Sequence, residues 1–242
     1  MDLALQLWSI NTELEKDFYG TLKKVAEMGY KGVEFAGYGG NSAQELKVKL
    51  EEYGLISVGS HISLERIKDN LKNEIEYNLV IGSKYLTCPR ANLKSYADVD
   101  NLTDILNNAA TESKKYGLQI AYHNHNQEFE KIGEEYILDL LMRNTIDVVF
   151  EIDVFWVKYA GLNPVDYIQK CGKKASLIHL KQIDAAKKCV DFSNGIIDML
   201  KVVEASKYAK YFIVEQDRFT LNPLASAKNN LAWMLSGTAL IY

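Results

Sequence analysis

The sequence predicts an α/β protein built as a single (β/α)8 barrel that spans residues 1–242. Short apolar runs alternate eight times with longer amphipathic stretches, which is the pattern of parallel strands connected by helices. No stretch resembles a linker, and a chain of 242 residues matches the roughly 250 residues of one such barrel. An open doubly wound sheet is the alternative. However, the run after the first strand, Ser9-Ile10-Asn11-Thr12, lacks the glycines of a phosphate-binding loop.

Four strand–helix pairs are predicted in the first half of the chain. The strands are the runs Leu3–Trp8, Gly32–Phe35, Leu55–Gly59 and Tyr85–Cys88. The first helix is indicated by the helical spacing of Leu14, Phe18, Leu22, Val25 and Met28. The second begins after Ser42, a good N-cap, and ends at Gly54. The remaining two helices cover about 64–81 and about 98–116.

The second half of the chain repeats the pattern. Its strands are Gln119–His123, Asp147–Ile152, Ser176–Leu180 and Tyr211–Val214. Its helices are predicted over Tyr136–Met142, after Asn163-Pro164, over Ile197–Ala205 and over Asn222–Leu235. The Asn-Pro pair places an N-cap before a proline in the first turn, where the missing N–H has no partner to lose.

Charge and composition narrow the class of function. The chain has 28 Lys and Arg against 32 Asp and Glu, which gives a net charge of −4 and no general attraction to nucleic acid or an anionic membrane. Three widely spaced cysteines form no disulfide or zinc framework, and the N-terminal residues lack the basic segment of a signal peptide. No apolar run reaches the ~20 residues of a membrane helix. We therefore expect a cytoplasmic protein that binds neither nucleic acid nor membrane.

Polar side chains stand at the ends of the predicted strands. All four histidines of the chain are among them, with five acidic residues and one lysine: Glu34, His61, His123, His125, Glu151, Asp153, His179, Lys181, Glu215 and Asp217. The carboxyl ends of the strands form the mouth of a (β/α)8 barrel, so these side chains should converge there. Residues two apart on a strand face the same way, so Glu151 and Asp153 should point into the barrel together.

Three of these residues suit a metal ion. Asp153, His179 and Glu215 end three consecutive strands. Imidazole and carboxylate ligands on rigid strands fit a divalent ion such as Mn2+, Co2+, Zn2+ or Mg2+. The alternative is a set of hydrogen-bonded structural residues, with Glu151, for example, paired with Lys181 inside the barrel. Several charges on adjacent strands favour the metal site, because isolated buried charges are costly.

Two tryptophans also follow predicted strands. Trp8 and Trp156 stand where an aromatic ring can stack on a ligand or pack at the rim of the barrel, and the sequence leaves both readings open. The three cysteines are expected to fill the core and not to act as nucleophiles.

Six short motifs recur in order along nearly the whole chain. They are QLWS at 6–9, GYKGVEF at 29–35, YHNH at 122–125 followed by EF at 128–129, DVFW at 153–156, HLK at 179–181 and VEQD at 214–217. Together they resemble the sugar phosphate isomerase/epimerase family, the xylose-isomerase-like TIM barrels. That group also contains inosose dehydratases, ketose 3-epimerases and metal-dependent apurinic endonucleases.

The resemblance implies one divalent metal ion held by residues of strands five to eight. Asp153, His179 and Glu215 match the family's positions on the last three of these strands. On strand five, epimerases of the family carry Glu where this chain has His123. The fourth ligand is therefore His123 itself or Glu128 in the following loop, and we favour Glu128, which the Tyr-His-Asn-His subgroup carries.

The resemblance also implies a metal-dependent isomerase or epimerase of a small sugar, keto-sugar or cyclitol. The metal ion polarises oxygens beside the reacting carbon, and a side chain removes a proton to give an enediolate. We expect His123 and Glu215 to transfer that proton. The residues expected to contact the substrate are Glu34, His61, His125, Trp156 and Lys181. A homodimer is an option that the sequence leaves open.

Three other functions stay open. A lyase or dehydratase of the inosose dehydratase type uses the same enolate but expels the group beta to the carbonyl. An endonuclease is disfavoured, since the chain has only four histidines and a net negative charge. A sugar-binding barrel without activity is suggested by three departures from the family pattern: Asn11 replaces Arg, Gln182 replaces Asp and Asn194 replaces an acidic residue.

Overall fold

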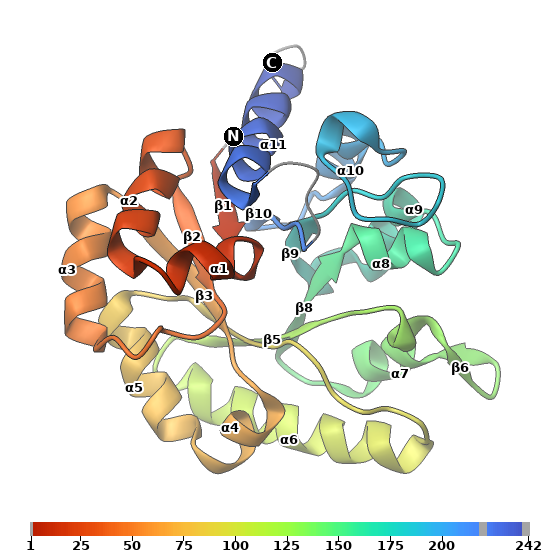
Figure 1. Ribbon diagram of the computed structural model, residues 1–242. Coiled ribbons are helices and arrows are strands. Elements are labelled where there is room, and N and C mark those ends of the chain that lie inside the picture. Colours follow the sequence, from red (N-terminus) through yellow and green to blue (C-terminus); the bar gives the residue numbers. More distant parts are fainter. Residues whose placement is uncertain (1, 218–221, 239–242) are drawn as a thin grey trace.

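The predicted barrel is present in the computed structural model, which describes residues 2–217 and 222–238 (Figure 1). Its strands are β1 (Leu3–Gln6), β2 (Gly32–Phe35), β3 (Ile56–His61), β4 (Tyr85–Cys88), β5 (Gln119–His123), β8 (Val148–Asp153), β9 (Ala175–Leu180) and β10 (Tyr211–Val214). They follow one another around a closed barrel in chain order, and β10 pairs with β1 to complete it. All pairs in the barrel are parallel. The predicted (β/α)8 fold is thus confirmed.

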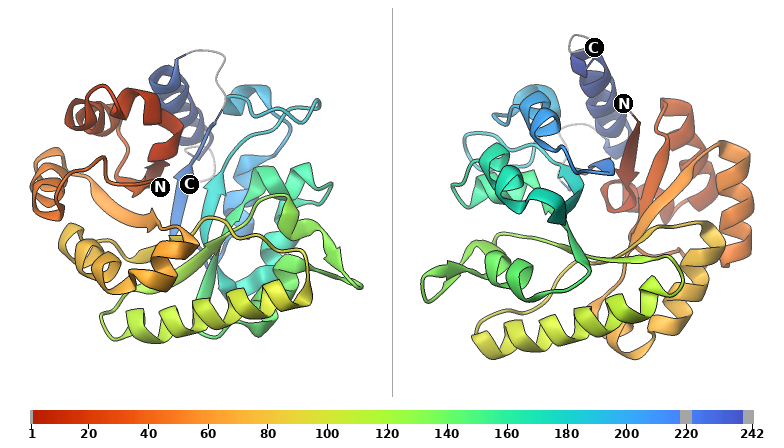
Figure 2. Two further views of the ribbon diagram at one scale, coloured as in Figure 1. Left: turned by 60° about the horizontal axis from the view of Figure 1, so that its bottom comes forward. Right: turned by 180° about the vertical axis from the view of Figure 1, so that it is seen from behind.

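Helices surround the barrel on its outside. The longer ones are α2 (Phe18–Met28), α3 (Ala43–Tyr53), α5 (Leu71–Ile81), α6 (Tyr96–Lys114), α7 (Ile137–Asn144), α9 (Pro164–Cys171), α10 (Met199–Ala205) and α11 (Pro223–Thr238). The short helices are α1 (Asn11–Leu14), α4 (Leu64–Asp69), α8 (Val154–Tyr159) and the 3-10 turns η1 (Leu7–Ile10), η2 (Gln127–Phe129), η3 (Gly172–Lys174) and η4 (Phe192–Asn194). Helix α11 lies beside α2, so the helical ring closes where the strands close (Figure 1, Figure 2). None of the described helices is long and apolar enough to cross a bilayer.

The first strand ends earlier than the sequence predicts. Extended structure is predicted as far as Trp8, whereas β1 ends at Gln6 and the next four residues form η1. The side-chain oxygen of Gln6 accepts a hydrogen bond from the backbone N–H of Trp8 at 3.0 Å. This bond satisfies one of the donors left unpaired at the start of a helical turn. Apolar patterning could not show the change, because Leu7 and Ile10 are buried in the turn as they would be in a strand.

Other differences lie in the connections that follow strands. The predicted helix over 64–81 is two helices, α4 and α5, interrupted at Asn70 with φ of −138°. Helix α8 follows β8 directly, where the sequence predicts no helix. A small hairpin of β6 (Lys131–Ile132) and β7 (Glu135–Tyr136) projects between β5 and α7 (Figure 1). These elements shape the mouth of the barrel and leave its wall as predicted.

The interior of the barrel is apolar at one end and polar at the other. The apolar cluster contains Ala4, Val58, Tyr85, Ala121, Leu177 and Ile213, with Val149 and Tyr211 packed against it. On five strands a histidine, a glutamate or a glutamine stands two positions after a member of this cluster or its contacts: Gln6, His123, Glu151, His179 and Glu215. Because alternate residues of a strand face the same side, this spacing stacks a polar layer on the apolar one. The mouth of the barrel therefore has a packed apolar floor.

Candidate metal-binding active site

Two groups of histidine and acidic side chains meet at the carboxyl ends of the strands. Among the described residues, the first comprises Glu34, His61, Glu151 and His179, and the second His123, Asp153, His179 and Glu215. In each group, one ligand atom from every residue lies within 4.8 Å of the others. We call the first the paired group and the second the open group, for reasons given below. The predicted convergence of the histidines is confirmed, since the ring of His123 lies 5.3 Å from that of His61 and 4.8 Å from those of His125 and His179.

The side chains of the paired group contact one another closely. His61 Nε2 lies 2.7 Å from Glu151 Oε2 and 3.3 Å from Glu34 Oε2. His179 Nε2 approaches the same two oxygens, at 3.2 Å from Glu151 and 2.8 Å from Glu34. Burial alone would lower the pKa of His61, but the two carboxylates outweigh it and raise that pKa to about 10. The two Nε2 atoms thus hold Glu34 Oε2 and Glu151 Oε2, while Glu34 Oε1 and Glu151 Oε1 are buried without a hydrogen-bond partner among the described residues.

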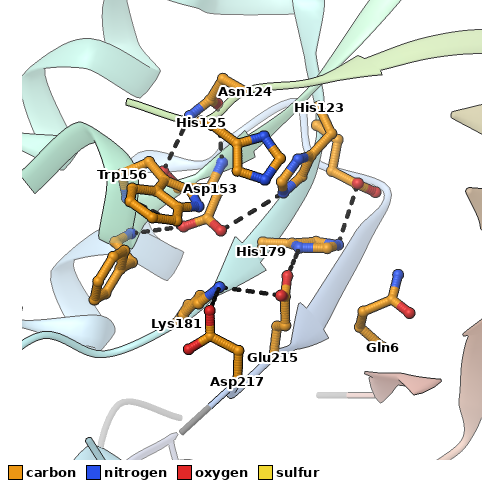
Figure 3. Close-up of polar contacts among 12 residues, drawn as sticks. Gln6, His123, Asn124, His125, Asp153, Trp156, His179, Lys181, Glu215 and Asp217 are labelled. Carbon is orange, nitrogen blue, oxygen red and sulfur yellow. Dashed lines mark hydrogen bonds and ion pairs between the residues drawn. The ribbon is translucent and has the colours of Figure 1, made fainter. Parts of the chain in front are cut away.

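His179 is held from both sides of its ring. Its Nδ1 lies 2.6 Å from Glu215 Oε2 (Figure 3). Its Nε2 lies 2.8 Å from Glu34 Oε2. Gln6 Nε2 donates to Glu34 Oε2 at 2.6 Å and so fixes that carboxylate in turn. Carboxylates that orient an imidazole in this way set which nitrogen faces a ligand and raise its basicity. The ring of His179 is therefore positioned before any ligand binds.

The open group contains buried atoms without partners. His123 Nδ1, His123 Nε2 and Asp153 Oδ2 form no hydrogen bond with any described residue, and His123 Nε2 lies 3.5 Å from Asp153 Oδ2 (Figure 3). Burial, followed by the neighbouring His179, lowers the pKa of His123 to about 3, which leaves the imidazole neutral. Burial likewise raises the pKa of Asp153 to about 7. Unpartnered buried polar atoms are costly, so such atoms facing one another indicate the position of a ligand. Neutral imidazole and carboxylate are the donors that fit a divalent metal ion.

The two carboxylate oxygens of Asp153 make different contacts. Its Oδ1 accepts from the backbone N–H groups of Phe155 at 2.8 Å and Trp156 at 3.3 Å, and so caps α8. The backbone N–H of Asp153 donates to Asn124 Oδ1 at 3.1 Å, which ties the end of β8 to the loop after β5. The cap fixes the rotamer of the carboxylate and turns Oδ2 toward His123.

Lys181 belongs to the opposite side of the open group. Its Nζ lies 3.0 Å from Glu215 Oε1 and 3.1 Å from Asp217 Oδ2, and it faces the rings of Phe155 and Trp156 at 5.4 Å each (Figure 3). Burial alone would lower the pKa of Lys181, but the surrounding carboxylates outweigh it and raise that pKa. The suggested pairing of Lys181 with Glu151 is therefore wrong, because Glu151 is bound by the two histidines instead.

Glu128, the favoured ligand from the loop after β5, lies outside both groups. Its carboxylate accepts hydrogen bonds from Tyr122 OH at 2.7 Å, the backbone N–H of His125 at 2.7 Å and Gln127 Nε2 at 2.8 Å. The 3-10 turn η2 folds Glu128 back onto the strand that precedes it. Glu128 therefore stabilises this loop. His123, and not Glu128, lies with the three other residues expected as metal ligands.

A cavity of about 500 Å3 opens above the two groups, and we call it the mouth cavity. Six predicted site residues line it: His61, His123, His125, Trp156, Lys181 and Glu215. Trp156 Nε1 and His125 Nδ1 are buried there and have no hydrogen-bond partner within the described chain. Their rings lie 5.4 Å apart, so they offer neighbouring polar atoms to a ligand. Glu34 is outside the described lining and lies beneath it, fully buried in the paired group.

Two residues of this region are missing from the site that the sequence predicts. Glu151 holds His61 and His179, and Gln6 holds Glu34. A signal existed for both, since Glu151 shares a strand face with Asp153 and Gln6 is a polar residue at the end of an apolar strand. Sequence patterning could not show which partner each would take, because both side chains contact residues from distant parts of the chain.

The departure at Gln182 has a structural explanation. Gln182 Oε1 accepts from the backbone N–H groups of Ile183 and Ile197, both at 2.9 Å, and its Nε2 donates to Ile197 O at 2.9 Å. Gly195 packs against this side chain, and a Cβ at that position would overlap it. Gln182 thus fastens the connection between β9 and α10, whereas Asn194 lies exposed in η4.

Gln182→Ala is expected to destabilise the protein by about 2–4 kcal/mol, because it removes three hydrogen bonds from a buried position. The measurement is the urea midpoint of unfolding. Asn194→Ala, at the exposed departure, serves as the control and should change the free energy of unfolding by less than ~0.5 kcal/mol. Equal midpoints for Gln182→Ala and the parent would contradict this account of the connection.

Comparison with known proteins agrees with this geometry. The family described as xylose isomerase-like TIM barrel matches residues 22–236. An inosose dehydratase from Geobacillus kaustophilus (strain HTA426) is 22% identical over 189 residues, which is 67% of this chain and 61% of the dehydratase. The match thus spans less than two thirds of that enzyme.

Two solved structures extend the comparison. A sugar phosphate isomerase/epimerase from Parabacteroides distasonis ATCC 8503 superposes with a TM-score of 0.86 at 25% identity, covering 97% of each chain. The IOLI protein, solved with a zinc atom, gives a TM-score of 0.76 at 15% identity over 98% of this chain and 97% of its own, and so shows a shared fold. With its closed barrel and a family match over most of its length, this chain belongs to the xylose isomerase-like TIM barrel family.

Proposed function

We propose that this protein is a divalent-metal-dependent isomerase or epimerase of a sugar or keto-sugar. The observation that carries the proposal is the open group, in which atoms of His123 and Asp153 that bond to no described residue meet His179 and Glu215. This group lies beside a cavity large enough for a small ligand. The similarity to a sugar phosphate isomerase/epimerase over 97% of each chain supports the same class of reaction.

The residues assigned to hold the metal ion are His123, Asp153, His179 and Glu215. When bound, the ion would polarise a substrate oxygen and stabilise the negative charge that develops on it. The mixed nitrogen and oxygen donors suit Mn2+, Co2+, Zn2+ or Mg2+. The zinc atom of the IOLI protein supports a metal in a barrel of this fold.

Glu215 is the group that we assign to proton transfer. It lines the mouth cavity, and its two oxygens are oriented by Lys181 and His179. Burial alone would raise the pKa of Glu215, but these two cations outweigh it and hold that pKa well below its usual range. The carboxylate can take a proton from a carbon next to a carbonyl, while the electron pair moves to the carbonyl oxygen and gives the enediolate. Return of the proton to the adjacent carbon isomerises the sugar. Epimerisation requires a second donor, which protonates the original carbon from the opposite face while Glu215 keeps the proton that it removed.

His123 and His61 have different roles in the proposed reaction. Both ring nitrogens of His123 are buried without a hydrogen-bond partner among the described residues, and Nε2 faces Asp153 Oδ2, so we assign His123 to the metal and not to proton transfer. His61 is protonated between Glu34 and Glu151 and lines the cavity. Its imidazolium can therefore donate a hydrogen bond to a substrate oxygen.

Elimination is the second candidate reaction, and the similarity to an inosose dehydratase favours it. It begins with the same removal of a proton next to a carbonyl. The enolate then expels the hydroxyl or alkoxyl group beta to that carbonyl and leaves an unsaturated ketone. The residues of the open group would serve both reactions, so the product distinguishes them.

The test is hydrogen exchange on a panel of ketoses, aldoses and cyclitol ketones in D2O. We expect the metal-loaded protein to replace the hydrogen beside the carbonyl with deuterium, as seen by loss of its proton NMR signal. Chelator-treated protein should show no exchange until metal is restored. A new sugar in the mixture would indicate isomerisation or epimerisation, and an ultraviolet-absorbing product would indicate elimination. Fully metal-loaded protein that exchanges no hydrogen on the panel would contradict the proposal and leave a sugar-binding barrel.

A further inference from the structure

A second hollow adjoins the mouth cavity at Trp8. This hollow has a volume of about 490 Å3 and shares Trp8, Ala36 and Gly37 with the lining of the mouth cavity. Its remaining walls come from η1, from the first helices and from the loop after β2. Both hollows are of the size that binds a small organic ligand. One ligand with two parts can therefore occupy them together.

Trp8 stands between the hollows as a fixed and exposed aromatic side chain. Its side chain belongs to a residue that is 54% exposed, although Leu7, Ser9 and Ile10 around it are buried. The backbone of Trp8 is anchored by Gln6, which also holds Glu34 of the paired group. Figure 3 shows Gln6 on the far side of His179 and Glu215 from Trp156. Trp8 and Trp156 thus lie on different walls of the mouth cavity, and the apolar face of an indole suits the C–H face of a sugar ring.

One of the residues shared by the two hollows is a glycine, Gly37. Gly37 has φ of +89°, a conformation that other residues rarely adopt, and a Cβ at Gly37 would meet no described atom within 4 Å. The same loop contains Gly39 and Gly40, also with positive φ. Gly37 therefore lines both hollows without adding a side chain to either.

The charged and polar residues around the second hollow indicate which kind of ligand it can bind. Its described lining has apolar side chains, Asn11 and Asn41, one acidic residue, Glu15, and no Lys or Arg. The mouth cavity, in contrast, carries Arg66, Arg90 and Lys181 in its own walls. A phosphate or carboxylate in the second hollow would face a carboxylate without a compensating cation. Apolar surface together with neutral amides fits a ring that carries hydroxyl groups.

We propose that the second hollow is a subsite for a second, uncharged sugar ring. The inference rests on the proposed function, in that the mouth cavity takes the reacting keto-sugar. The substrate is then a keto-sugar that carries a neutral glycosyl group, and Trp8 separates and contacts its two rings.

The experiment compares fructose with its glucosyl derivatives on the metal-loaded protein. Turanose, leucrose and isomaltulose carry glucose on different hydroxyls of fructose, so they sample the direction in which the second ring leaves. We expect at least one to bind about tenfold more tightly than fructose by calorimetry, which is the value of one aromatic stacking contact. Saturation transfer should reach the protons of its glucosyl ring. Any gain in affinity of fructose 6-phosphate, the anionic comparison, should come from the cations of the mouth cavity and should survive Trp8→Ala.

Trp8→Ala should remove the difference in affinity between the glucosyl derivative and fructose. Tyr116→Ala is the matched control, because Tyr116 is 49% exposed and lies outside the described lining of both hollows, and it should keep the difference. The subsite is overturned if no two-ring sugar binds more tightly than fructose, or if Trp8→Ala keeps the difference between them. These outcomes are separate from the proposed function, which fails when metal-loaded protein exchanges no hydrogen, whatever it binds.

Discussion

Asp153→Asn is expected to abolish metal binding and turnover while the barrel stays folded. The amide keeps the oxygen that caps α8, so the hydrogen bonds to Phe155 and Trp156 remain. Oδ2 has no hydrogen-bond partner among residues 2–217 and 222–238. The substitution replaces this oxygen by an NH2 group, which cannot ligate a cation. Loss of a residue that only orients a ligand raises the metal dissociation constant ~10–100-fold, so loss of a ligand itself should raise it further. Elemental analysis after dialysis and a titration with Mn2+ or Zn2+ measure the change.

Stability and a neighbouring carboxylate provide the controls for this variant. Because a neutral amide replaces an unpaired buried carboxylate, the metal-free variant should unfold at a urea concentration no lower than the metal-free parent. Asp217→Asn changes a carboxylate that contacts Lys181 in the same cavity but belongs to neither group, and it should keep the metal. His179 is a poorer choice, since its loss removes one partner from each of the buried carboxylates Glu34 and Glu215 and would also destabilise the barrel. Stoichiometric metal in Asp153→Asn would contradict the assigned ligand set.

His123→Leu is expected to lower metal affinity by more than ~10-fold, whereas Glu128→Gln should bind metal as the parent does. The leucine side chain fills the buried position of His123 without a donor nitrogen. Glu128→Gln places an NH2 group against Tyr122 OH, the His125 N–H or Gln127, so it should cost about 1–3 kcal/mol in stability instead. The pair of variants therefore decides which residue near the end of β5 serves the metal.

The readouts for this pair are metal content, turnover and the urea midpoint. The assignment of His123 is refuted if Glu128→Gln loses the metal and His123→Leu keeps it. A third result has its own meaning: His123→Leu with full metal content and turnover reduced ~10²–10⁴-fold would make His123 the proton acceptor, as the sequence first suggests.

Much of the barrel and part of its mouth follow from the sequence for a common reason. Parallel strands are buried on both faces, so they read as short apolar runs, and glycines and N-caps mark the helices between them. The chemistry of such a barrel lies at the strand ends, so a polar residue that terminates an apolar run is informative. Asp153, His179 and Glu215 were predictable on this basis, and the structure brings them together.

The parts that the sequence could not predict depend on contacts between distant segments. Glu128 matches a family pattern, but the turn after β5 directs it to Tyr122 and away from the mouth. The helix predicted over 64–81 breaks at Asn70, a residue that apolar periodicity does not weigh. The sequence indicates Asp153 as a ligand, but it does not indicate that the same carboxylate caps α8. In each case one side chain had two plausible partners and tertiary packing chose between them.

The two-residue spacing between the apolar floor and the polar layer also bears on how the chain avoids misfolding. A strand that pairs one residue out of register turns every side chain to the opposite face. For β9 such a slip would move His179 and Leu177 out of the interior and press a charged ring into the layer between strands and helices. The carboxylates of Glu34, Glu151 and Glu215 would at the same time each lose one of their partners, His179. Uncompensated buried charges cost several kcal/mol each, so the residues assigned to chemistry also penalise mispaired strands while the barrel assembles.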